Sequence, residues 1–314
     1  MSRKDNLAQT VNIIKQELPD VIIKLHEPLK NHTTFKIGGP VYAMLFPESV
    51  KDLTKICEIS GRYESIPFII GNGSNILASN KNHDIIVIKT SNINNISLVN
   101  EGSSATQGNV LIKVDAGVLL SEAAVFACKN SLTGFEFAHG IPGTAGGAVV
   151  MNAGAYGREM KDVVHSTTIY NKTLGKQELT ATDNGFSYRR SRFSGTDDVI
   201  LSTVIQLEKG DRAVIENKIN DFDNRRKNSQ PLEFPSGGST FKRPAEGYAA
   251  ALIEQAGLKG YSNGGAQVSE KHTGFVINRG NASFEDTVAV IEHVQETVFK
   301  QFGVQLELEV KVLG

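Results

Sequence analysis

Residues Gly140–Gly157, GIPGTAGGAVVMNAGAYG, hold six glycines in eighteen positions and give the strongest indication of the fold. An even spread of the chain's 30 glycines over 314 residues would place fewer than two there. Glycine lets the backbone approach another group closely and adopts positive φ, at an entropic cost of about 0.5–1 kcal/mol per site. Successive backbone N–H groups in such a loop form a concavity suited to an anion, usually a phosphate. A set of tight turns is the alternative, but six glycines interleaved with Asn152 and Tyr156 favour a loop that holds a ligand.

A second glycine motif, Gly71–Leu77 (GNGSNIL), directly follows the apolar run Pro67–Ile70. A strand that ends in such a turn can present backbone amides and a hydroxyl to a diphosphate. The motif is no dinucleotide fingerprint of the Rossmann type, because Ile76 stands where the third glycine belongs, and no Walker loop occurs. Alone, the motif fits a hairpin turn equally well. Two such loops in one predicted domain suggest a long ligand with a central diphosphate, such as a flavin dinucleotide.

The composition is typical of a soluble globular protein with room for about two domains. Its 33 basic and 34 acidic residues include no basic tract, which argues against a nucleic-acid partner. The polar start MSRKDN and the short apolar runs predict a cytoplasmic protein with no membrane partner. Cys57 and Cys128 are expected to be reduced, buried thiols. Seven scattered histidines without ligand spacing predict no metal site.

The apolar spacing predicts helices and strands in an irregular order. Helices are expected at 7–18, after a Ser49–Asp52 capping pair, and at 119–130, 213–227, 248–256 and 284–302, the last capped by Ser283 and Asp286. Strands are expected at 41–46, 66–70, 85–88, 109–114, 163–170 and 199–207. The lack of a regular strand–helix–strand rhythm favours an α+β fold. The polar segment 207–212 marks a domain boundary.

A final strand is predicted at 304–312, where Val304, Leu306, Leu308, Val310 and Val312 alternate with polar residues. Its polar face carries Glu307, Glu309 and Lys311. Taken alone, this face is a solvated one.

Two further segments could bind an anion or carry chemistry. Tyr188–Phe193 (YRRSRF) places three guanidinium groups beside two aromatic rings, and arginine suits carboxylate or phosphate recognition. In Pro235–Pro244 (PSGGSTFKRP), paired glycines would expose the Ser239 hydroxyl close to Lys242 and Arg243. The alternatives are a basic surface loop and an interdomain loop. No GxSxG elbow accompanies Ser239, so a serine-hydrolase triad has little support.

Taken together, these strings resemble one family, the UDP-N-acetylenolpyruvoylglucosamine reductases, in the compact type II subgroup. The resemblance extends from NHTTFKIGGP at 31–40 through GNGSNIL, the glycine loop, YRRSRF, GGSTFKRP and GGAQVSEKHTGFVIN to the closing LELEV. It implies an α+β fold with a two-part FAD-binding module of the vanillyl-alcohol-oxidase (PCMH) type at 1–207, split near 85–90. A C-terminal α+β substrate-binding domain would occupy 208–314, with the last strand bringing Glu309 to the active site in the crevice between the domains.

The resemblance also implies non-covalent FAD, with NADPH as co-substrate and no metal. The cofactor-binding residues would come from both glycine motifs: Gly71, Asn72, Gly73, Ser74, Asn75, Leu77, Pro142, Gly143, Thr144, Ala145, Gly146, Gly147, Asn152, Gly154 and Ala155. NADPH would reduce FAD, and the flavin hydride would then add to C3 of the enolpyruvyl ether of UDP-N-acetylenolpyruvoylglucosamine. The product is UDP-N-acetylmuramate, a precursor of peptidoglycan.

Three catalytic residues carry over from the family. Arg189 would stabilise the enolate-like charge on the substrate carboxylate. Glu309, if protonated or hydrogen-bonded, would donate to the same oxygens. Ser239 would protonate C2.

The assignments on the substrate side carry less weight. Tyr188, Arg225, Arg243, Lys259 and His272 are candidates for contact with the substrate or the nicotinamide. Only 50 positions separate Arg189 from Ser239, which implies that a tyrosine-bearing loop of other family members is absent and that the cleft is open. The protein is expected to be a monomer.

Two other readings stay open. Another FAD-dependent oxidase or dehydrogenase of the same cofactor fold would share the glycine motifs, but GGSTF and LELEV resemble the reductase's substrate side. A non-catalytic nucleotide-binding protein could keep the glycine loops, although the presence of Arg189, Ser239 and Glu309 argues against it.

Overall fold

The computed structural model describes residues 3–99, 109–245 and 247–314. They form two compact units: Met1–His26, Tyr42–Asn72 and Asp84–Asn224 make the first, and Glu27–Val41, Gly73–His83 and Arg225–Gly314 make the second. The second unit therefore takes two short segments from the N-terminal part of the chain. One boundary between the units falls inside the GNGSNIL motif, after Asn72.

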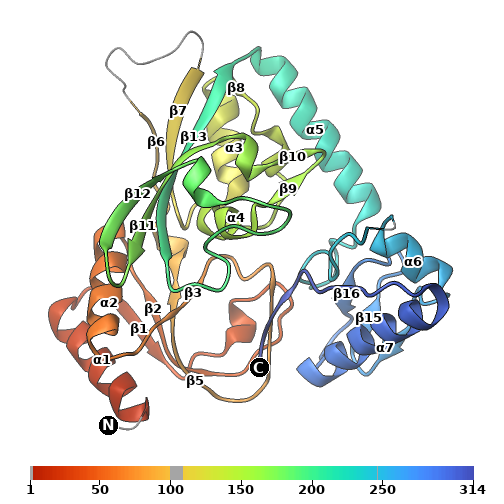
Figure 1. Cartoon of the computed structure of the whole chain (residues 1–314), viewed down its shortest axis with the longest axis horizontal. Coiled ribbons are helices and arrows are strands. Elements are labelled where there is room, and N and C mark those ends of the chain that lie inside the picture. The colour runs from red at the N-terminus through yellow and green to blue at the C-terminus, as the bar shows by residue number, and fades with distance from the viewer. Residues whose placement is uncertain (1–2, 100–108, 246) are drawn as a thin grey trace. The chain divides into compact units, whose positions relative to one another are not determined.

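The first unit contains two sheets (Figure 1). The smaller has the strand order β1-β2-β5-β3, from Ile22–Leu25, Val41–Phe46, His83–Lys89 and Phe68–Ile70. The larger has the order β12-β11-β13-β7-β6, from Gly175–Thr180, Val164–Asn171, Val199–Lys209, Asn109–Asp115 and Ile96–Leu98, and β8 (Leu132–Thr133) pairs with β13. The unit also contains a separate two-stranded hairpin of β9 (Gly154–Ala155) and β10 (Arg158–Glu159).

Each sheet of this unit has helices and a core of its own. Beside the smaller sheet, α1 (Arg3–Glu17) and α2 (Val50–Arg62) pack together, with Leu7, Ile14 and Leu53 in the core (Figure 1). The larger sheet packs on α3 (Leu120–Lys129) and α4 (Ala145–Met151). Strand β13 is buried on both faces over its first five residues. Helix α5 (Arg212–Ser229) is the last helix of the first unit, and its residues from Arg225 onward belong to the second unit.

The second unit is built around α6 (Ala249–Gln255) and α7 (Phe284–Phe302). They share a core with the antiparallel sheet β14-β15-β16, from Ser262–Asn263, Ala266–Val268 and Val276–Asn278. Separately, β17 (Lys311–Leu313) pairs in parallel with β4 (Ile76–Ala78). This pairing ties the C-terminal end of the chain to the segment that carries the second half of the GNGSNIL motif.

The expected α+β class and the helices are confirmed, as is the Ser49 cap, whose hydroxyl accepts a hydrogen bond from the Asp52 amide at 3.1 Å. The strands expected up to 207 are present with shifts of one to two residues at their ends. Both cysteines are buried, and burial raises the pKa of Cys57 to about 12.

The predicted final strand was wrong in its extent, because only Lys311–Leu313 forms a regular strand. The alternation it rested on holds in part, since Leu306 and Val310 are buried and Gln305 and Glu307 are exposed, but Val312 is exposed as well. Residues 304–310 have no continuous partner strand. They are held by separate contacts, such as the bridge between Phe241 and Leu308.

The expected domain boundary at 207/208 stays a prediction. The division between the two compact units lies elsewhere in the chain. It falls at 224/225, inside α5, because the first part of this helix packs on the first unit through Ile215 and Ile219 against Cys128. The expected split of the FAD-binding module near 85–90 stays a prediction.

Candidate active site

The two glycine motifs meet within the first unit. The Asn72 side-chain amide donates to the Pro142 carbonyl at 2.7 Å. A Cβ on Gly71 would lie 2.1 Å from Oγ1 of Thr144, so only glycine allows this hydroxyl so close to the backbone. The Lys89 ammonium, which is largely buried, donates to the Gly71 carbonyl. The structure therefore places Gly71 and Asn72 beside the 142–144 segment, and a shared role of the two loops in holding one ligand stays a prediction.

Thr144 is the most informative residue of this loop pair. Its side chain is buried, and Oγ1 has no hydrogen-bond partner among the described residues. Buried polar atoms in this condition are uncommon and call for an explanation, such as a group that binds there. Gly147 also lies near this hydroxyl, because a Cβ built on Gly147 would lie 3.6 Å from Oγ1 of Thr144. The loop pair thus fits a polar ligand that reaches the Thr144 hydroxyl.

Other residues of the glycine loop are used by the fold itself. The Ala145 amide donates to the Val118 carbonyl at 2.8 Å, and the Gly146 amide donates to the Ala116 carbonyl at 2.9 Å. A Cβ on Gly146 would lie 3.0 Å from that of Ala116. The Gly143 carbonyl accepts from the Leu120 amide at 3.0 Å. Gly146 is therefore required for close packing, and the amides of Ala145 and Gly146 are already bonded.

The second half of the GNGSNIL motif belongs to the second unit, where it holds the segment that carries Glu309. The Asn75 side-chain amide donates to the Glu309 carbonyl at 3.1 Å, and the Asn75 carbonyl accepts from the Lys311 amide at 2.9 Å. Leu77 is buried and pairs with Val312. Gly73 has φ +64°, and a Cβ there would lie 2.1 Å from the His32 carbonyl oxygen. Ser74 is half-buried.

Ser239 and Glu309 lie on neighbouring segments of the second unit. The Glu309 amide donates to the carbonyl of Thr240, the residue after Ser239, at 2.9 Å. Thr240 is itself fixed, because its amide donates to the Gly274 carbonyl and its hydroxyl accepts from the Val276 amide, both at 2.9 Å. Ser239 is exposed and Glu309 is half-buried. The structure thus brings together the backbone segments that carry Ser239 and Glu309, from positions 70 apart in the sequence.

Arg189 lies in the first unit, at the tip of a tight turn. The amide and carbonyl of Ser187 bond the carbonyl and amide of Arg190, at 2.9 and 3.2 Å, which leaves Tyr188 and Arg189 at the corners. Arg189 has φ +52°, a conformation uncommon for a residue with a side chain. Its guanidinium lies 5.0 Å from the centre of the Tyr188 ring and donates to the Gly154 carbonyl at 3.1 Å.

Asn152, Gly154 and Ala155 surround this turn. Asn152 is fully buried in the left-handed conformation, with φ +43°. Its side-chain amide donates to the Ser187 carbonyl and to the Glu159 carboxylate, both at 3.0 Å, and its side-chain oxygen accepts from the Lys161 amide at 2.9 Å. Gly154 and Ala155 form β9. The cofactor-binding role expected for these three residues stays a prediction.

The remaining substrate candidates are spread over both units. Tyr188 is exposed, and Arg225 lies on α5. Arg243 stacks on Tyr248, with its guanidinium 4.1 Å from the ring centre. Lys259 pairs with a carboxylate of α6, Glu254, at 3.2 Å.

The last of these candidates, His272, is held neutral by its surroundings. Burial lowers its pKa, against the opposing effect of a backbone hydrogen bond. Its Nδ1 accepts from the Gly274 amide at 3.2 Å.

The sequence analysis missed Glu159 and Lys89. Glu159 was hidden in a short hairpin, and its Oε1 lies 3.7 Å from Nη1 of Arg189. The glycine pair at 154 and 157, which predicts a tight hairpin, was the available signal. Lys89 ends a strand and gave no signal by itself.

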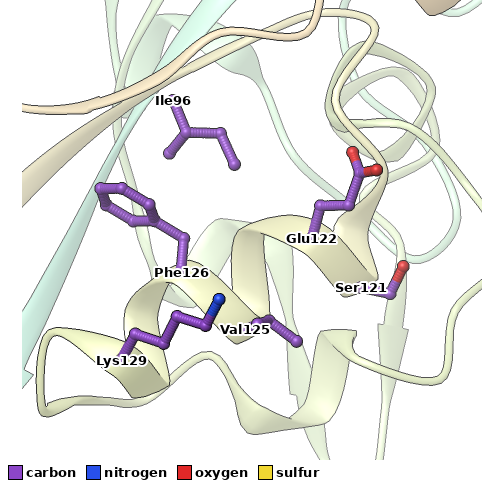
Figure 2. Close-up of a pocket in the computed structure, with 6 residues that line it drawn as sticks. All are labelled: Ile96, Ser121, Glu122, Val125, Phe126 and Lys129. Carbon is purple, nitrogen blue, oxygen red and sulfur yellow. The ribbon is translucent and has the colours of Figure 1, made fainter.

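One cavity is lined by other residues. Figure 2 shows it along α3, where it has a volume of 370 Å³ and is lined by Ile96, Ser121, Glu122, Val125, Phe126 and Lys129. None of its lining residues is a predicted site residue. Over the described ranges, no group of three or more metal-ligating side chains is found, and no helix is long and apolar enough to cross a bilayer.

Comparison with known proteins identifies the class first. The family model of the FAD binding domain matches residues 41–178, and that of the UDP-N-acetylenolpyruvoylglucosamine reductase C-terminal domain matches 230–313. The chain is therefore an FAD-dependent oxidoreductase that combines an FAD-binding domain with the C-terminal domain of the reductase family. This combination agrees with the α+β fold expected from the sequence. Both glycine motifs lie within the matched FAD-binding region.

The relatives narrow the class to one family. The reductase of Caldanaerobacter subterraneus subsp. tengcongensis is 46% identical over 97% of this chain and 98% of its own. That of Clostridium perfringens strain SM101 is 42% identical over 93% of each. The crystal structure of the Thermus caldophilus reductase superposes with a TM-score of 0.75 at 29% identity, over 94% of this chain and 99% of that one. The chain belongs to the UDP-N-acetylenolpyruvoylglucosamine reductase family.

Proposed function

We propose that this protein reduces the enolpyruvyl ether of UDP-N-acetylenolpyruvoylglucosamine to UDP-N-acetylmuramate, with NADPH as the source of electrons. The observation that carries the proposal is the arrangement of Ser239 and Glu309 on two segments joined through Thr240. Segments joined in this way can present both residues to one reacting group. Family membership supplies the substrate class.

FAD would be held by the two glycine motifs. The contact between the loops and the unpartnered Thr144 hydroxyl support this assignment. When bound, FAD supplies the hydride that C3 of the substrate receives. The protein positions and polarises the reactants.

The three catalytic residues have separate tasks. Arg189 stabilises the negative charge that develops on the substrate carboxylate, because a fixed guanidinium aimed at developing charge needs little reorganisation during reaction. Ser239 gives its proton to C2, where the adjacent carbanion character makes even a weakly acidic hydroxyl a competent donor if it is well placed. Glu309 hydrogen-bonds to the same group of substrate atoms.

The exposed cationic candidates would serve the substrate's diphosphate. Arg243 has an ordered guanidinium, since it stacks on Tyr248 and donates from Nε to the Gly247 carbonyl at 3.2 Å. An arginine preordered in this way loses less freedom when it binds an anion. We assign Arg243 the strongest role among Tyr188, Arg225, Arg243, Lys259 and His272.

Ser239→Ala tests the proposal because the two half-reactions can be measured separately. By stopped-flow absorbance, we expect NADPH to reduce the flavin at the wild-type rate. Reoxidation by the enolpyruvyl substrate should slow by at least about 10²-fold, the usual contribution of a positioned proton donor. Ser262→Ala, at another exposed serine of the second unit, is the matched control and should change neither rate.

Two results would count against the proposal. Equal loss in both half-reactions would give Ser239 a structural role. A wild-type flavin that NADPH reduces but the enolpyruvyl substrate does not reoxidise would indicate another flavoenzyme of the same cofactor fold.

A further inference from the structure

The carboxylate of Glu159 lies beside the guanidinium of Arg189 within the first unit. Both side chains are 19% exposed, and Oε1 of Glu159 is 3.7 Å from Nη1 of Arg189. In the β9–β10 hairpin, Glu159 is the register partner of Gly154, whose carbonyl accepts from Nη2 of Arg189 at 3.1 Å. One register pair of the hairpin therefore presents a carboxylate and a carbonyl to the same guanidinium.

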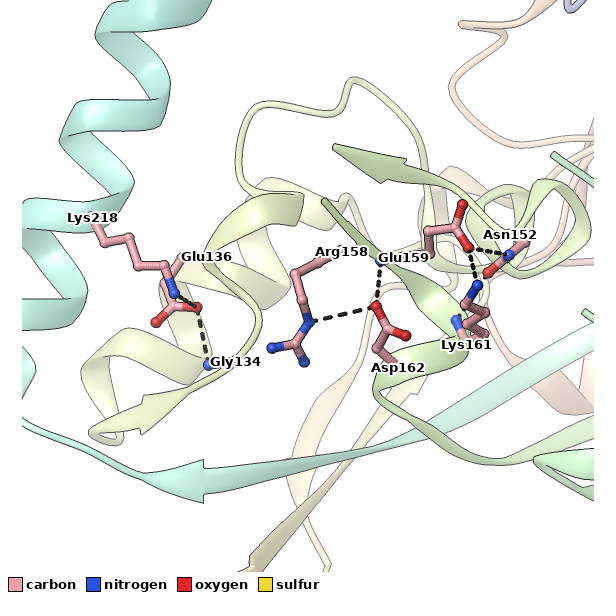
Figure 3. A network of polar contacts seen from close by, with 8 residues as sticks. All are labelled: Gly134, Glu136, Asn152, Arg158, Glu159, Lys161, Asp162 and Lys218. Atoms are coloured by element: carbon pink, nitrogen blue, oxygen red, sulfur yellow. Dashed lines mark hydrogen bonds and ion pairs between the residues drawn. The ribbon is translucent and has the colours of Figure 1, made fainter. Parts of the chain in front are cut away.

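The carboxylate itself is held from its other side (Figure 3). Its Oε2 accepts from the Asn152 side-chain amide at 3.0 Å and from the Lys161 ammonium at 2.8 Å. The backbone amide of Glu159 donates to Asp162 at 2.8 Å. Glu159 is thus fixed in both its backbone and its side chain before it meets Arg189.

The same buried amide also fixes the turn that carries Arg189. Asn152 donates to the Ser187 carbonyl at 3.0 Å, which anchors the first residue of the 187–190 turn. Asn152 therefore holds Arg189 at both ends, because it bonds Ser187, which positions the backbone of Arg189, and Glu159, which lies beside its guanidinium. The strained φ of +52° at Arg189 is held by this double attachment.

We propose that Glu159 is the positioning residue of Arg189. It sets the direction of the guanidinium without touching substrate. The inference rests on the role of Arg189 in the proposed reaction. The negative charge of Glu159 offsets part of the positive charge of Arg189. Glu159 therefore weakens the attraction of Arg189 for the substrate carboxylate while it fixes the orientation of the guanidinium.

The test is Glu159→Gln, which keeps the shape and removes the charge. We expect the saturating rate of flavin reoxidation by the enolpyruvyl substrate to fall by about 10²-fold, the usual cost of a small misplacement. The substrate concentration for half-saturation should stay constant or fall, because Arg189 loses its neighbouring negative charge. Binding of UDP-N-acetylmuramate to the oxidised enzyme, measured by calorimetry, should likewise be unchanged or tighter.

Glu136→Gln is the matched control. Glu136 is a buried carboxylate of the same unit that pairs with Lys218 at 3.5 Å (Figure 3). Its substitution should lower thermal stability and leave both rates unchanged. A general effect of removing a buried carboxylate would appear in both variants.

A double-mutant cycle separates positioning from structural support. In an Arg189→Lys background, Glu159→Gln should change the reoxidation rate by less than about threefold, because the group it positions is gone. Full additivity, or a Glu159→Gln variant with wild-type rates, would overturn the inference. A wild-type enzyme that the enolpyruvyl substrate fails to reoxidise would instead refute the proposed function.

Lys161→Met covers the case in which Glu159→Gln does not fold. Lys161 has a half-exposed side chain, so its loss should be tolerated, yet it removes a charge-assisted hydrogen bond from Glu159. We expect a reoxidation rate about threefold below that of Lys172→Met, a control that loses an exposed pair with Asp197. Equal rates in these two variants would also overturn the inference.

Discussion

At the scale of single residues, the glycine loops show two different uses of a missing side chain. Gly71 admits the Thr144 hydroxyl against the backbone, while Gly146 admits the side chain of Ala116. The first use leaves a polar atom that no described residue bonds, and the second leaves a closed packing contact. We therefore expect FAD binding to depend on the surroundings of Thr144 more than on the number of glycines.

Thr144→Val tests this directly, because valine keeps the shape and removes the hydroxyl. Without cofactor, the variant should be as stable as the wild type or more stable, since an unpaired buried hydroxyl costs about 1–3 kcal/mol. Its affinity for FAD, measured by fluorescence titration, should fall by roughly tenfold, the equivalent of one hydrogen bond of about 1.4 kcal/mol.

The control is Thr167→Val in β11, which removes another buried hydroxyl that has no partner in the described part of the chain. This variant should show the same change in apoprotein stability with wild-type affinity for FAD. Equal affinities for FAD in Thr144→Val and the wild type would show that Thr144 does not contact the cofactor.

At the scale of elements, the start of α7 joins a helix cap to the fold of the second unit. The Ser283 hydroxyl accepts from the Asp286 amide at 3.0 Å, and the Asp286 carboxylate accepts from the Ser283 and Gly265 amides at 2.9 and 3.3 Å. Hydrogen bonds from these amides lower the pKa of Asp286, with Ser283 the larger cause. The cap therefore also fixes the turn before β15.

Asp286→Asn should reveal this contribution through its pH dependence. The lowered pKa means that the charged form stabilises the fold, by about 0.5–1 kcal/mol for a carboxylate at a helix N-terminus. This stability is present above the ordinary value of 3.8 and is lost as the pH falls through the lowered pKa of the folded protein. Urea unfolding should show the variant less stable at pH 7, with the difference shrinking below pH 4.

Glu285→Gln is the comparison for this prediction. Glu285 lies in the same first turn and is exposed. Its substitution should change stability by less. A difference between Asp286→Asn and the wild type that is constant from pH 7 to pH 3 would contradict the assignment.

At the scale of the whole molecule, each compact unit draws on distant parts of the chain. The second unit combines 27–41 and 73–83 with the C-terminal residues, and its parallel β4–β17 pair joins positions more than 230 apart. In the first unit, the loops at 71–72 and 142–147 meet through Asn72 and Thr144. Ligand binding to such loops stabilises contacts between segments that are remote in sequence.

Removal of FAD should therefore destabilise the protein by mass action. At a free FAD concentration of 100 times the dissociation constant, the holoenzyme should gain about 2.7 kcal/mol over the apoprotein. Thermal unfolding of apoprotein titrated with FAD would show a midpoint that rises with concentration. Ser239→Ala should follow the same curve, whereas a midpoint independent of FAD in the wild type would refute binding to the folded state alone.

The local features of this protein could be predicted from its amino-acid sequence. Apolar spacing and capping residues predicted the helices, because these signals act within a few residues of one another. Glycine density predicted the two loops, and the order of motifs indicated the family. The alternation of apolar and polar residues before Glu309 was also visible in the sequence, although the prediction of a continuous strand over 304–312 was wrong.

Which of these segments are in contact with one another could be seen only in the folded protein. The pairing of β4 with β17, the adjacency of Ser239 and Glu309 through Thr240, and the position of Glu159 beside Arg189 all depend on contacts between distant segments. Such contacts leave no period or spacing in one sequence, because hydrogen bonds and ion pairs form between whichever groups the packed core brings within reach. For the same reason, the sequence marked Thr144 as one residue in a glycine loop, and the fold made it a buried hydroxyl without a partner among the residues described.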